Sequence, residues 1–369
     1  MKIERINARE IEMDLLAPFE TSFGVMKNRR ILLLEVITDQ GIGWGELTAP
    51  DFPFYNSETI DTAWLMLDQF LVPLVLGVEF DDVSTLSTLM TRVRGHEMAK
   101  GTLETAVWDA VARSRGISLA SMLGGTLTEI PCGVSLGIHT EVSALLDRIA
   151  GELSAGYQRV KLKIKPGKDV EVVAAVRARY PQINLTVDAN SAYTLAEIDL
   201  LRQLDDFGLD YIEQPLQWNE IYRHAELQRQ LKTPICLDEC IHSLRDVEAS
   251  VELEAARIIN IKLGRVGGHA QASAIQDYCR KHDIPVWSGG MLETGIGRAH
   301  NIAMSSLPGF TLPGDVSASE RYWARDITTE PIRVTPRGTI VVPAGPGTGF
   351  EPDHDYIRSL TSTQKTWAP

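Results

Sequence analysis

The spacing of hydrophobic and polar positions changes along the chain, and it divides the chain into strand-like and helical stretches. The apolar run in RRILLLEVITDQGIGWGELTAP stops at the polar DQG and then resumes, which predicts a β-hairpin. Further along, Leu103, Val107 and Val111 recur at a spacing of four, which indicates a helix that a Gly–Gly pair ends. Residues 1–125 therefore predict an α+β unit, and we place its boundary near Thr126.

From about Pro131, short apolar runs alternate with longer helical patterns. This alternation indicates right-handed βαβ units and a parallel sheet. The runs are CGVSLGI, RVKLKI, INLTVDAN, LDYIEQP, TPICLDEC, ARIINIKLG and IPVWSGG, with a last one expected near FTLPGDV. So many strands suit a closed barrel better than an open sheet. Residues 126–325 therefore predict an α/β fold, a (β/α)7β modified TIM barrel.

The last residues, 326–369, return to an antiparallel pattern in which PRG is a turn between two β-rich runs. A tail of this kind cannot extend a parallel barrel. We expect it to pack back on the N-terminal part and to complete an α+β capping domain, so that the chain forms a compact body of two domains.

Composition narrows the class of protein. The chain has 369 residues, 44% of them hydrophobic and 23% charged, which is typical of a globular protein with large cores. A net charge of −13 argues against nucleic acid or anionic membranes as partners. No run approaches the roughly 20 apolar residues of a membrane span, and the N-terminus lacks the apolar core of a signal peptide. Four cysteines fit a reducing compartment. We expect a cytoplasmic enzyme.

Polar residues recur at a regular spacing where the barrel-like strands end. Asp188 lies 25 residues after Lys163, Glu213 25 after Asp188, Asp238 25 after Glu213, and Lys262 24 after Asp238. Because one βα unit is one step around the barrel, we expect these five side chains at equivalent heights. Each follows an apolar run and precedes a loop, which places it at the C-terminal mouth where such barrels carry out chemistry.

The three acids in this series predict a metal site. Converging carboxylates repel each other without a cation, and Mg²⁺ accepts one oxygen from each while it keeps other positions for water or substrate. Mn²⁺ or another divalent ion can substitute. A single strand-end acid is more often a loop start or a helix cap, so the prediction depends on three in register.

Lys163 and Lys262 flank the acids. Between them, a carboxylate substrate can lose its α-proton to form an enolate that the cation stabilises. A lysine acts as a base only when its pKa falls well below about 10.4, which nearby cations such as the metal ion, Lys161 and Arg265 favour. The alternation Lys161, Lys163, Lys165 also fits a charged edge strand, which the position one βα unit before the acids disfavours. An alternative class is a non-catalytic, metal-stabilised binding protein.

The motifs KLK (161–163), VDAN, IEQP, LDE, NIKLGRVGG and SGGMLETGIGRAH together resemble the enolase superfamily over essentially the whole chain, and the two lysines resemble its muconate-lactonising subgroup. The resemblance implies Asp188, Glu213 and Asp238 as Mg²⁺ ligands and Lys163 and Lys262 as the acid/base pair. It also implies Lys161 as an electrostatic partner of the substrate carboxylate, and Asn190 and Glu239 as supporting groups.

Within the subgroup, KLKIKPG, Arg265 and LPGDVSASERYW resemble the branch of o-succinylbenzoate synthases (menaquinone pathway) and N-succinylamino acid racemases. Both reactions begin with removal of an α-proton. Muconate cycloisomerase and dipeptide epimerase are the alternatives. Dipeptide epimerases carry an Asp-x-Asp at the last strand, where this chain has Asp315 and then Ser317, which counts against a dipeptide substrate.

Further residues are expected around a small-molecule carboxylate. The glycine-rich stretch from Ser288, Gly289 and Gly290 to Met291 is interpreted as a backbone-lined wall of the pocket. Around the substrate we also expect Ser135, Glu293 and Asp315. By resemblance, the loop 18–30 is a mobile lid that sets specificity, with Phe19, Phe23, Gly24 and Met26 as candidate contacts. We expect the protein to be a homo-oligomer.

Overall fold

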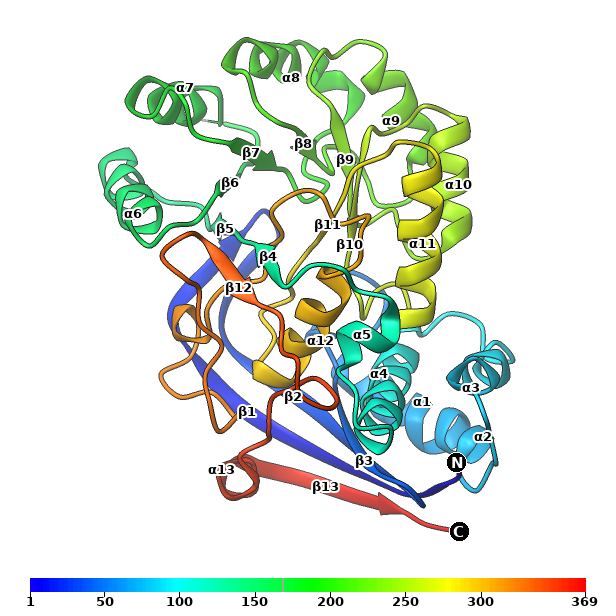
Figure 1. Cartoon of the computed structure of the whole chain (residues 1–369). Coiled ribbons are helices and arrows are strands. Elements are labelled where there is room, and N and C mark those ends of the chain that lie inside the picture. Colours follow the sequence, from blue (N-terminus) through cyan, green and yellow to red (C-terminus); the bar gives the residue numbers. More distant parts are fainter. Residues whose placement is uncertain (168) are drawn as a thin grey trace.

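The computed structural model describes residues 1–167 and 169–369. It consists of an antiparallel cap sheet with helices at its side and a parallel sheet with its own layer of helices (Figure 1). Over the described residues, no helix combines the length and the hydropathy needed to cross a membrane. The four cysteines are all buried and unbridged.

The cap sheet has four strands in the order β13-β1-β2-β3. The strands are β1 Ile3–Thr21, β2 Gly24–Thr38, β3 Ile42–Glu46 and β13 Thr361–Trp367. The expected hairpin around DQG is confirmed, because β2 and β3 pair on either side of it. Six short or long helical segments follow: α1 Ile60–Met66, η1 Leu67–Leu71, α2 Val72–Val75, α3 Val83–Met90, α4 Glu97–Ser114 and α5 Leu119–Leu123.

The predicted single helical stretch over 102–125 is divided in the structure. Helix α4 ends at Ser114, and Gly116 takes a positive φ of 66° before α5 begins at Leu119. Gly124 ends α5 in the left-handed conformation, as the sequence predicts. The apolar residues of α4 pack in one core with the cap sheet and its helices. This packing stabilises α4 although the helical stretch is interrupted after it.

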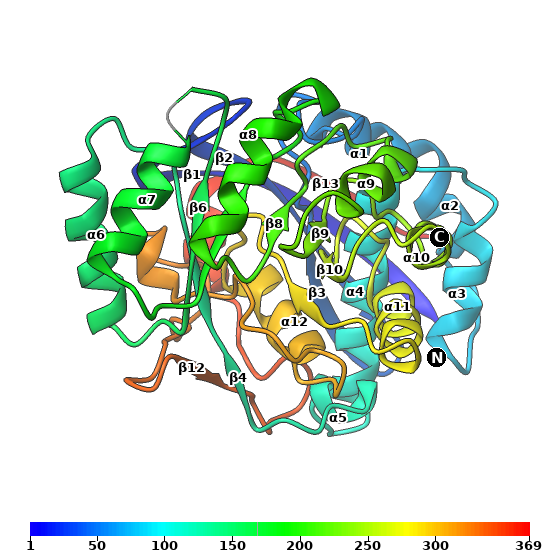
Figure 2. The ribbon, with the colours of Figure 1, turned by 90° about the horizontal axis from the view of Figure 1, so that it is seen from above.

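The barrel is built on a seven-stranded parallel sheet in the order β5 to β11, which confirms the predicted α/β architecture. The strands are β5 Gly133–Leu136, β6 Arg159–Lys163, β7 Leu185–Asp188, β8 Ile212–Glu213, β9 Ile235–Leu237, β10 Ile258–Ile261 and β11 Val286–Ser288. The helices are α6 Val142–Ser154, α7 Asp169–Arg179, η2 Leu195–Glu197, α8 Ile198–Gln203, η3 Leu204–Phe207, α9 Ile221–Gln228, α10 Leu244–Glu252, α11 His269–Lys281 and α12 Gly295–Ser305. Helices α6 to α11 surround the strands (Figure 2).

The last run, near FTLPGDV, does not form a regular strand. It instead makes isolated bridges from Phe310 to Val286 of β11 and from Gly314 to Cys132 beside β5. Pro308 and Pro313 have no N–H to donate to a ladder, which explains why pairing is interrupted. This segment nevertheless joins the two edges of the sheet and so closes the barrel.

The C-terminal tail differs in detail from the prediction. Strand β12 (Thr339–Val341) follows the PRG turn but pairs with β4 (Glu129–Pro131) near the barrel. The contact with the cap sheet is made by β13, whose residues pair with β1. The short helix η4 (Ser319–Arg321) precedes the tail, and α13 (His354–Leu360) lies within it. The two termini consequently lie on the same side of the molecule (Figure 1).

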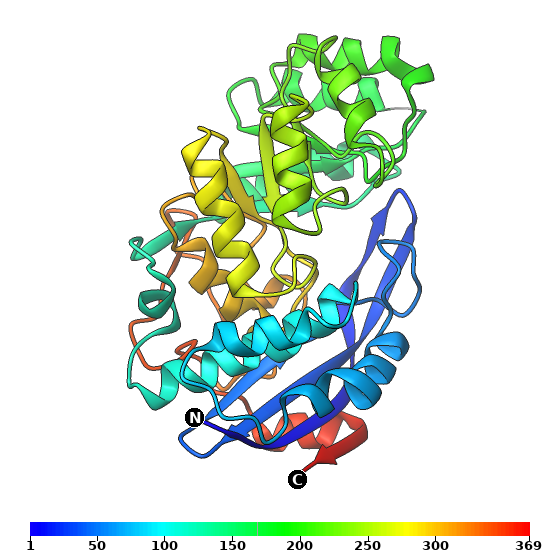
Figure 3. The same ribbon diagram turned by 90° about the vertical axis from the view of Figure 1, so that its right-hand side faces the viewer.

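The predicted lid loop is a β-hairpin. Residues 18–30 form the far ends of β1 and β2, with the turn between Thr21 and Gly24. The hairpin rises from the cap sheet towards the mouth of the barrel (Figure 3). The segment is paired strand rather than an irregular loop, and the register between β1 and β2 shifts between Asp14 and Phe19, which breaks the simple alternation of apolar and polar positions. We refer to residues 18–30 as the lid hairpin.

Glycines at β3 allow helix α4 to lie directly on the cap sheet. A Cβ at Gly43 would come within 2.1 Å of the Ala106 carbonyl oxygen, and one at Gly45 within 2.1 Å of the Thr102 carbonyl oxygen. Side chains at these positions would hold the helix away from the sheet, so the close packing of α4 requires both glycines.

We predict that Gly43→Ala lowers the free energy of unfolding by about 3 kcal/mol, because the added methyl overlaps the backbone of α4. Denaturant titration followed by circular dichroism measures the change. The matched control is Gly151→Ala in α6, where the new Cβ meets nothing within 4 Å and should stabilise the helix by up to about 1 kcal/mol. Equal unfolding midpoints for the two variants would contradict the packing argument.

Candidate active site

Strand β6 directs a row of three cations into the barrel. Arg159, Lys161 and Lys163 occupy alternate positions, and Arg159 and Lys161 are each only 2% exposed. Lys165 lies beyond the end of the strand, with a side chain 49% exposed that pairs with Glu20 of the lid hairpin at 3.3 Å. The inward row therefore begins one step earlier than the KLK motif and excludes Lys165.

The predicted series of polar residues follows the strand ends, but not at one height. Lys163 is the register partner of Asp188, and Asp188 is the partner of Glu213. Glu213 then pairs with Cys236, so Asp238 lies two residues further along its strand. The prediction of equal heights is wrong for the later members because strands in a barrel are staggered. A shift of two keeps Asp238 on the inward face.

Each of the three predicted metal-ligating acids contacts a buried ammonium group. The Lys161 Nζ lies 2.7 Å from Glu213 Oε2 and 3.3 Å from Asp188 Oδ2. Lys163 lies 2.6 Å from Asp188 Oδ2, and Lys262 lies 2.8 Å from Asp238 Oδ2. Two of the acids thus converge on one cation, Lys161, while Asp238 is held separately.

Over residues 1–167 and 169–369, no three His, Cys, Asp or Glu side chains are gathered in the geometry of a metal site. The donor chemistry nevertheless fits a hard divalent ion, because Asp188, Glu213 and Asp238 are almost fully buried carboxylates from consecutive strands. Glu239 adds a buried Oε2 atom that makes no hydrogen bond. Burial and the Asp188 charge raise the pKa of Glu213, so a further cation here would relieve an existing electrostatic cost.

Lys161 and Lys262 have raised pKa values, whereas the sequence argument expects a lowered pKa for a catalytic lysine. Burial acts to lower the pKa of Lys262, but the charges of Tyr55, Glu239 and Glu213 raise it by more. The pKa of Lys262 therefore lies above its ordinary value. Burial also acts to lower the pKa of Lys161, but the negative charges of Asp315, Glu213 and Asp188 raise it well above its ordinary value. The neighbouring acids therefore raise the pKa of these two lysines by more than the neighbouring cations lower it.

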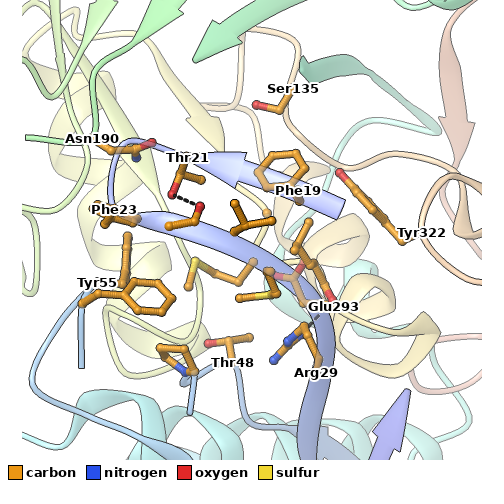
Figure 4. A pocket seen from close by; sticks show the side chains of 18 of the residues that line it. Phe19, Thr21, Phe23, Arg29, Thr48, Tyr55, Ser135, Asn190, Glu293 and Tyr322 are labelled. Carbon is orange, nitrogen blue, oxygen red and sulfur yellow. Dashed lines mark hydrogen bonds between the residues drawn. The ribbon is translucent and has the colours of Figure 1, made fainter. Parts of the chain in front are cut away.

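A cavity of about 240 Å³ opens above these charges, beneath the lid hairpin (Figure 4). Its polar floor includes Lys161, Lys163 and Lys262, and its roof includes aromatic residues of the lid hairpin. Most of the predicted residues line it: Phe19, Phe23, Gly24, Met26, Ser135, Lys161, Lys163, Asn190, Lys262, Gly290, Met291, Glu293 and Asp315. Glu239 lines an adjoining cavity of about 400 Å³, which shares Phe23, Tyr55 and Asn190 with the first.

Three other residues that the sequence analysis assigned to the site lie outside the lining of the cavity. Arg265 is 1% exposed, outside the lining of the cavity, and donates to the carbonyls of Ile241 and Asn260 and to Asp238. Ser288 and Gly289 also lie behind the wall. A Cβ on Gly289 would come within 2.4 Å of Asn260 Oδ1 and within 2.8 Å of Lys262 Cε, so this glycine makes room for both side chains.

The sequence analysis missed Tyr55 and Phe54. The Tyr55 hydroxyl donates to Asp238 Oδ1 at 3.1 Å, and the ring centroid lies 4.5 Å from Lys262 Nζ. The Phe54 ring stacks on Phe23 of the lid hairpin at 5.3 Å. Both residues come from an irregular segment after β3, where no periodicity indicates which side chains turn inward. The one sequence feature that could have indicated them is the cluster of aromatic residues in DFPFY.

Comparison with known proteins assigns the family. The chain matches the mandelate racemase/muconate lactonizing enzyme N-terminal domain over residues 5–124 and the enolase C-terminal domain-like family over residues 144–356. It therefore belongs to the enolase superfamily and is an enzyme of its mandelate racemase/muconate-lactonizing group.

More particular similarities concern two curated enzymes and one crystal structure. The chain is 47% identical to an o-succinylbenzoate synthase from Geobacillus kaustophilus over 99% of this chain and 97% of that one. It is 48% identical to an N-succinylamino acid racemase from Amycolatopsis sp over 100% and 99% of the two chains. A crystal structure of an enolase superfamily member from Listeria innocua matches with a TM-score of 0.96 and 41% identity, covering 100% of this chain and 99% of that one.

We predict that Lys161→Met lowers the free energy of unfolding by about 3–5 kcal/mol, because it leaves buried acids without their cation. The matched control is Lys165→Met, which removes the half-exposed pair with Glu20 and should cost less than about 1 kcal/mol. Thermal and denaturant unfolding of the two variants give the comparison. Similar losses in both would mean that the buried ammonium is not required for charge balance.

Proposed function

We propose that this enzyme removes a proton α to a carboxylate, as an o-succinylbenzoate synthase, an N-succinylamino acid racemase, or both. The observation that carries the proposal is the placement of Lys163 and Lys262. Lys163 ends β6 and Lys262 follows β10, the three acid-bearing strands lie between them, and both lysines line one cavity. A substrate carbon held between them has an amine on each side.

The lysines would perform the proton transfers. A neutral Lys Nζ takes the α-proton and becomes an ammonium, while the electron pair of the C–H bond moves onto the substrate carboxylate. In racemisation, the opposite lysine returns a proton to the other face. In the synthase reaction, a lysine ammonium gives its proton to the β-hydroxyl, which leaves as water while the enolate electron pair forms the new C=C bond and the ring becomes aromatic. Both outcomes share the first step and conserve atoms and charge.

We propose Asp188, Glu213 and Asp238 as ligands of Mg²⁺ or another divalent ion. When bound, such an ion would stabilise the negative charge that develops on the substrate carboxylate. The chain's own residues orient the bases: Asn190 Oδ1 accepts from Lys163 at 2.7 Å, and Tyr55 lies against Lys262. Lys161 adds a fixed positive charge at the floor of the cavity.

The roof of the cavity supports an apolar substrate portion. Phe19, Phe23, Met26, Phe54 and Met291 line it, which suits a ring or a hydrophobic amino acid side chain. We propose that, as a synthase, the enzyme acts in menaquinone biosynthesis in the cytoplasm. We also propose a homo-oligomer, in keeping with the expectation from the sequence.

The structure gives no support to a dipeptide substrate. Recognition of a substrate ammonium by Asp-x-Asp needs two free carboxylates at the last strand. Asp315 pairs with Arg159 and Lys161, both at 2.8 Å. Ser317 is 1% exposed, and its hydroxyl makes no hydrogen bond. Asp315 is therefore already paired, and Ser317 supplies no second carboxylate for an Asp-x-Asp site.

We predict that Lys163→Ala and Lys262→Ala each lower racemisation of N-succinylphenylalanine by at least about a thousandfold, because one of two bases is lost. Each variant should still exchange the α-proton of one enantiomer with deuterium, and the two variants should retain opposite enantiomers. Proton NMR in D₂O measures the exchange, and circular dichroism confirms folding. Racemisation retained in either variant would contradict the two-base mechanism. Parallel assays of ring-forming dehydration compare the two activities.

We predict that dialysis against EDTA abolishes activity and that Mg²⁺ restores it. Mg²⁺ should also raise the unfolding temperature of the wild type, because an ion that binds only the folded state stabilises it by about 2.7 kcal/mol at a hundred times its Kd. Asp188→Asn should reduce this shift. Full activity without metal, or an equal thermal shift in the variant, would contradict the proposed ligands.

A further inference from the structure

Near its turn, the lid hairpin makes three polar contacts with the barrel, in addition to the hydrogen bond from Arg29 to the Leu292 carbonyl. The Glu20 carbonyl accepts from the Ile138 N–H at 3.1 Å, and the Glu20 carboxylate pairs with Lys165 at 3.3 Å. At the turn, the Ser22 hydroxyl donates to the Asn190 carbonyl at 3.1 Å. The first two contacts anchor the hairpin to loops after β5 and β6. The third reaches a residue that is itself part of the site.

Asn190 is a junction of hydrogen bonds at the floor of the cavity. Its Oδ1 accepts from Lys163 at 2.7 Å, its Nδ2 donates to Glu239 at 3.0 Å, and its backbone N–H donates to Asp188 at 2.9 Å. It also has a φ of 43°, which is uncommon for a residue with a side chain. Asparagine tolerates this left-handed conformation better than most residues with a side chain, and the bond from Ser22 is one of the contacts at its backbone.

We infer that Ser22 is a positioning residue that links closure of the lid hairpin to the orientation of Lys163 through Asn190. This inference rests on the proposed two-base function. Over the described residues, the hydrogen bond and ion pair of Lys262 go to Asp238, and its ammonium lies over Tyr55, so neither contact comes from the lid hairpin. The link therefore acts on one of the two bases.

An effect on one base has a stereochemical consequence. Each lysine faces the α-proton of one enantiomer, so loss of the Ser22 hydroxyl should slow exchange of one enantiomer selectively. A general loosening of the lid hairpin would slow both. The affected enantiomer is identified independently, because it is the one whose exchange is lost in Lys163→Ala.

The test is α-proton exchange of N-succinyl-L-phenylalanine and N-succinyl-D-phenylalanine in D₂O, followed by NMR for the wild type, Ser22→Ala and Lys163→Ala. Ser22→Ala should lower kcat for exchange of the Lys163-facing enantiomer by about tenfold, the effect of one lost hydrogen bond. The other enantiomer should change by less than about twofold. Ser22→Thr, which keeps a hydroxyl, should restore the wild-type ratio.

Lys165→Ala is the matched control, because it removes a different contact of the same hairpin that does not reach Asn190. It should affect both enantiomers equally. Ser22→Ala would overturn the inference if it slowed both enantiomers alike, neither, or only the enantiomer that Lys163→Ala retains. A wild type that exchanges neither enantiomer would instead overturn the proposed function and, with it, this inference.

Discussion

Charge balance inside the barrel is the constraint on which the rest of the site depends. Strand β6 places Arg159, Lys161 and Lys163 on one inward face, and an unpaired buried cation costs several kcal/mol. The acids of neighbouring strands supply the compensation. Asp315 lies 2.8 Å from both Arg159 and Lys161, and Asp188 lies 2.6 Å from Lys163. No member of this network can change its charge without a cost at the others.

The same network orients the functional groups. Lys161 is held between carboxylates, and its ammonium also lies 4.7 Å from the centre of the Trp287 ring. The Arg159 guanidinium lies 5.0 Å from the centre of that ring. One indole therefore makes cation–π contacts with both Arg159 and Lys161. Arg159 therefore contributes without reaching the cavity: it fixes Asp315, and Asp315 fixes Lys161. Side chains held in this way lose little freedom when a substrate binds.

The barrel and its charged floor could be predicted because they follow periodic patterns. The repeat of about 25 residues identifies successive strand ends, and alternation along β6 identifies the inward face. Contacts between segments distant in the chain have no such signature. Tyr55, the Ser22–Asn190 bond and the burial of Arg265 depend on how the cap lies against the barrel. The stagger that moves Asp238 two residues along its strand is likewise a property of the closed barrel.

The division of the cavity into a charged floor and an apolar roof bears on how one site can serve two reactions. Removal of the α-proton needs only the floor, where Lys163 and Lys262 are fixed by ion pairs with Asp188 and Asp238. The roof comes from the lid hairpin and the segment around Phe54, whose aromatic and methionine side chains adapt to different apolar shapes. Dehydration and racemisation diverge only after the shared step. The choice between them therefore depends on the leaving group that the substrate carries and on how the roof orients it above an unchanged set of bases.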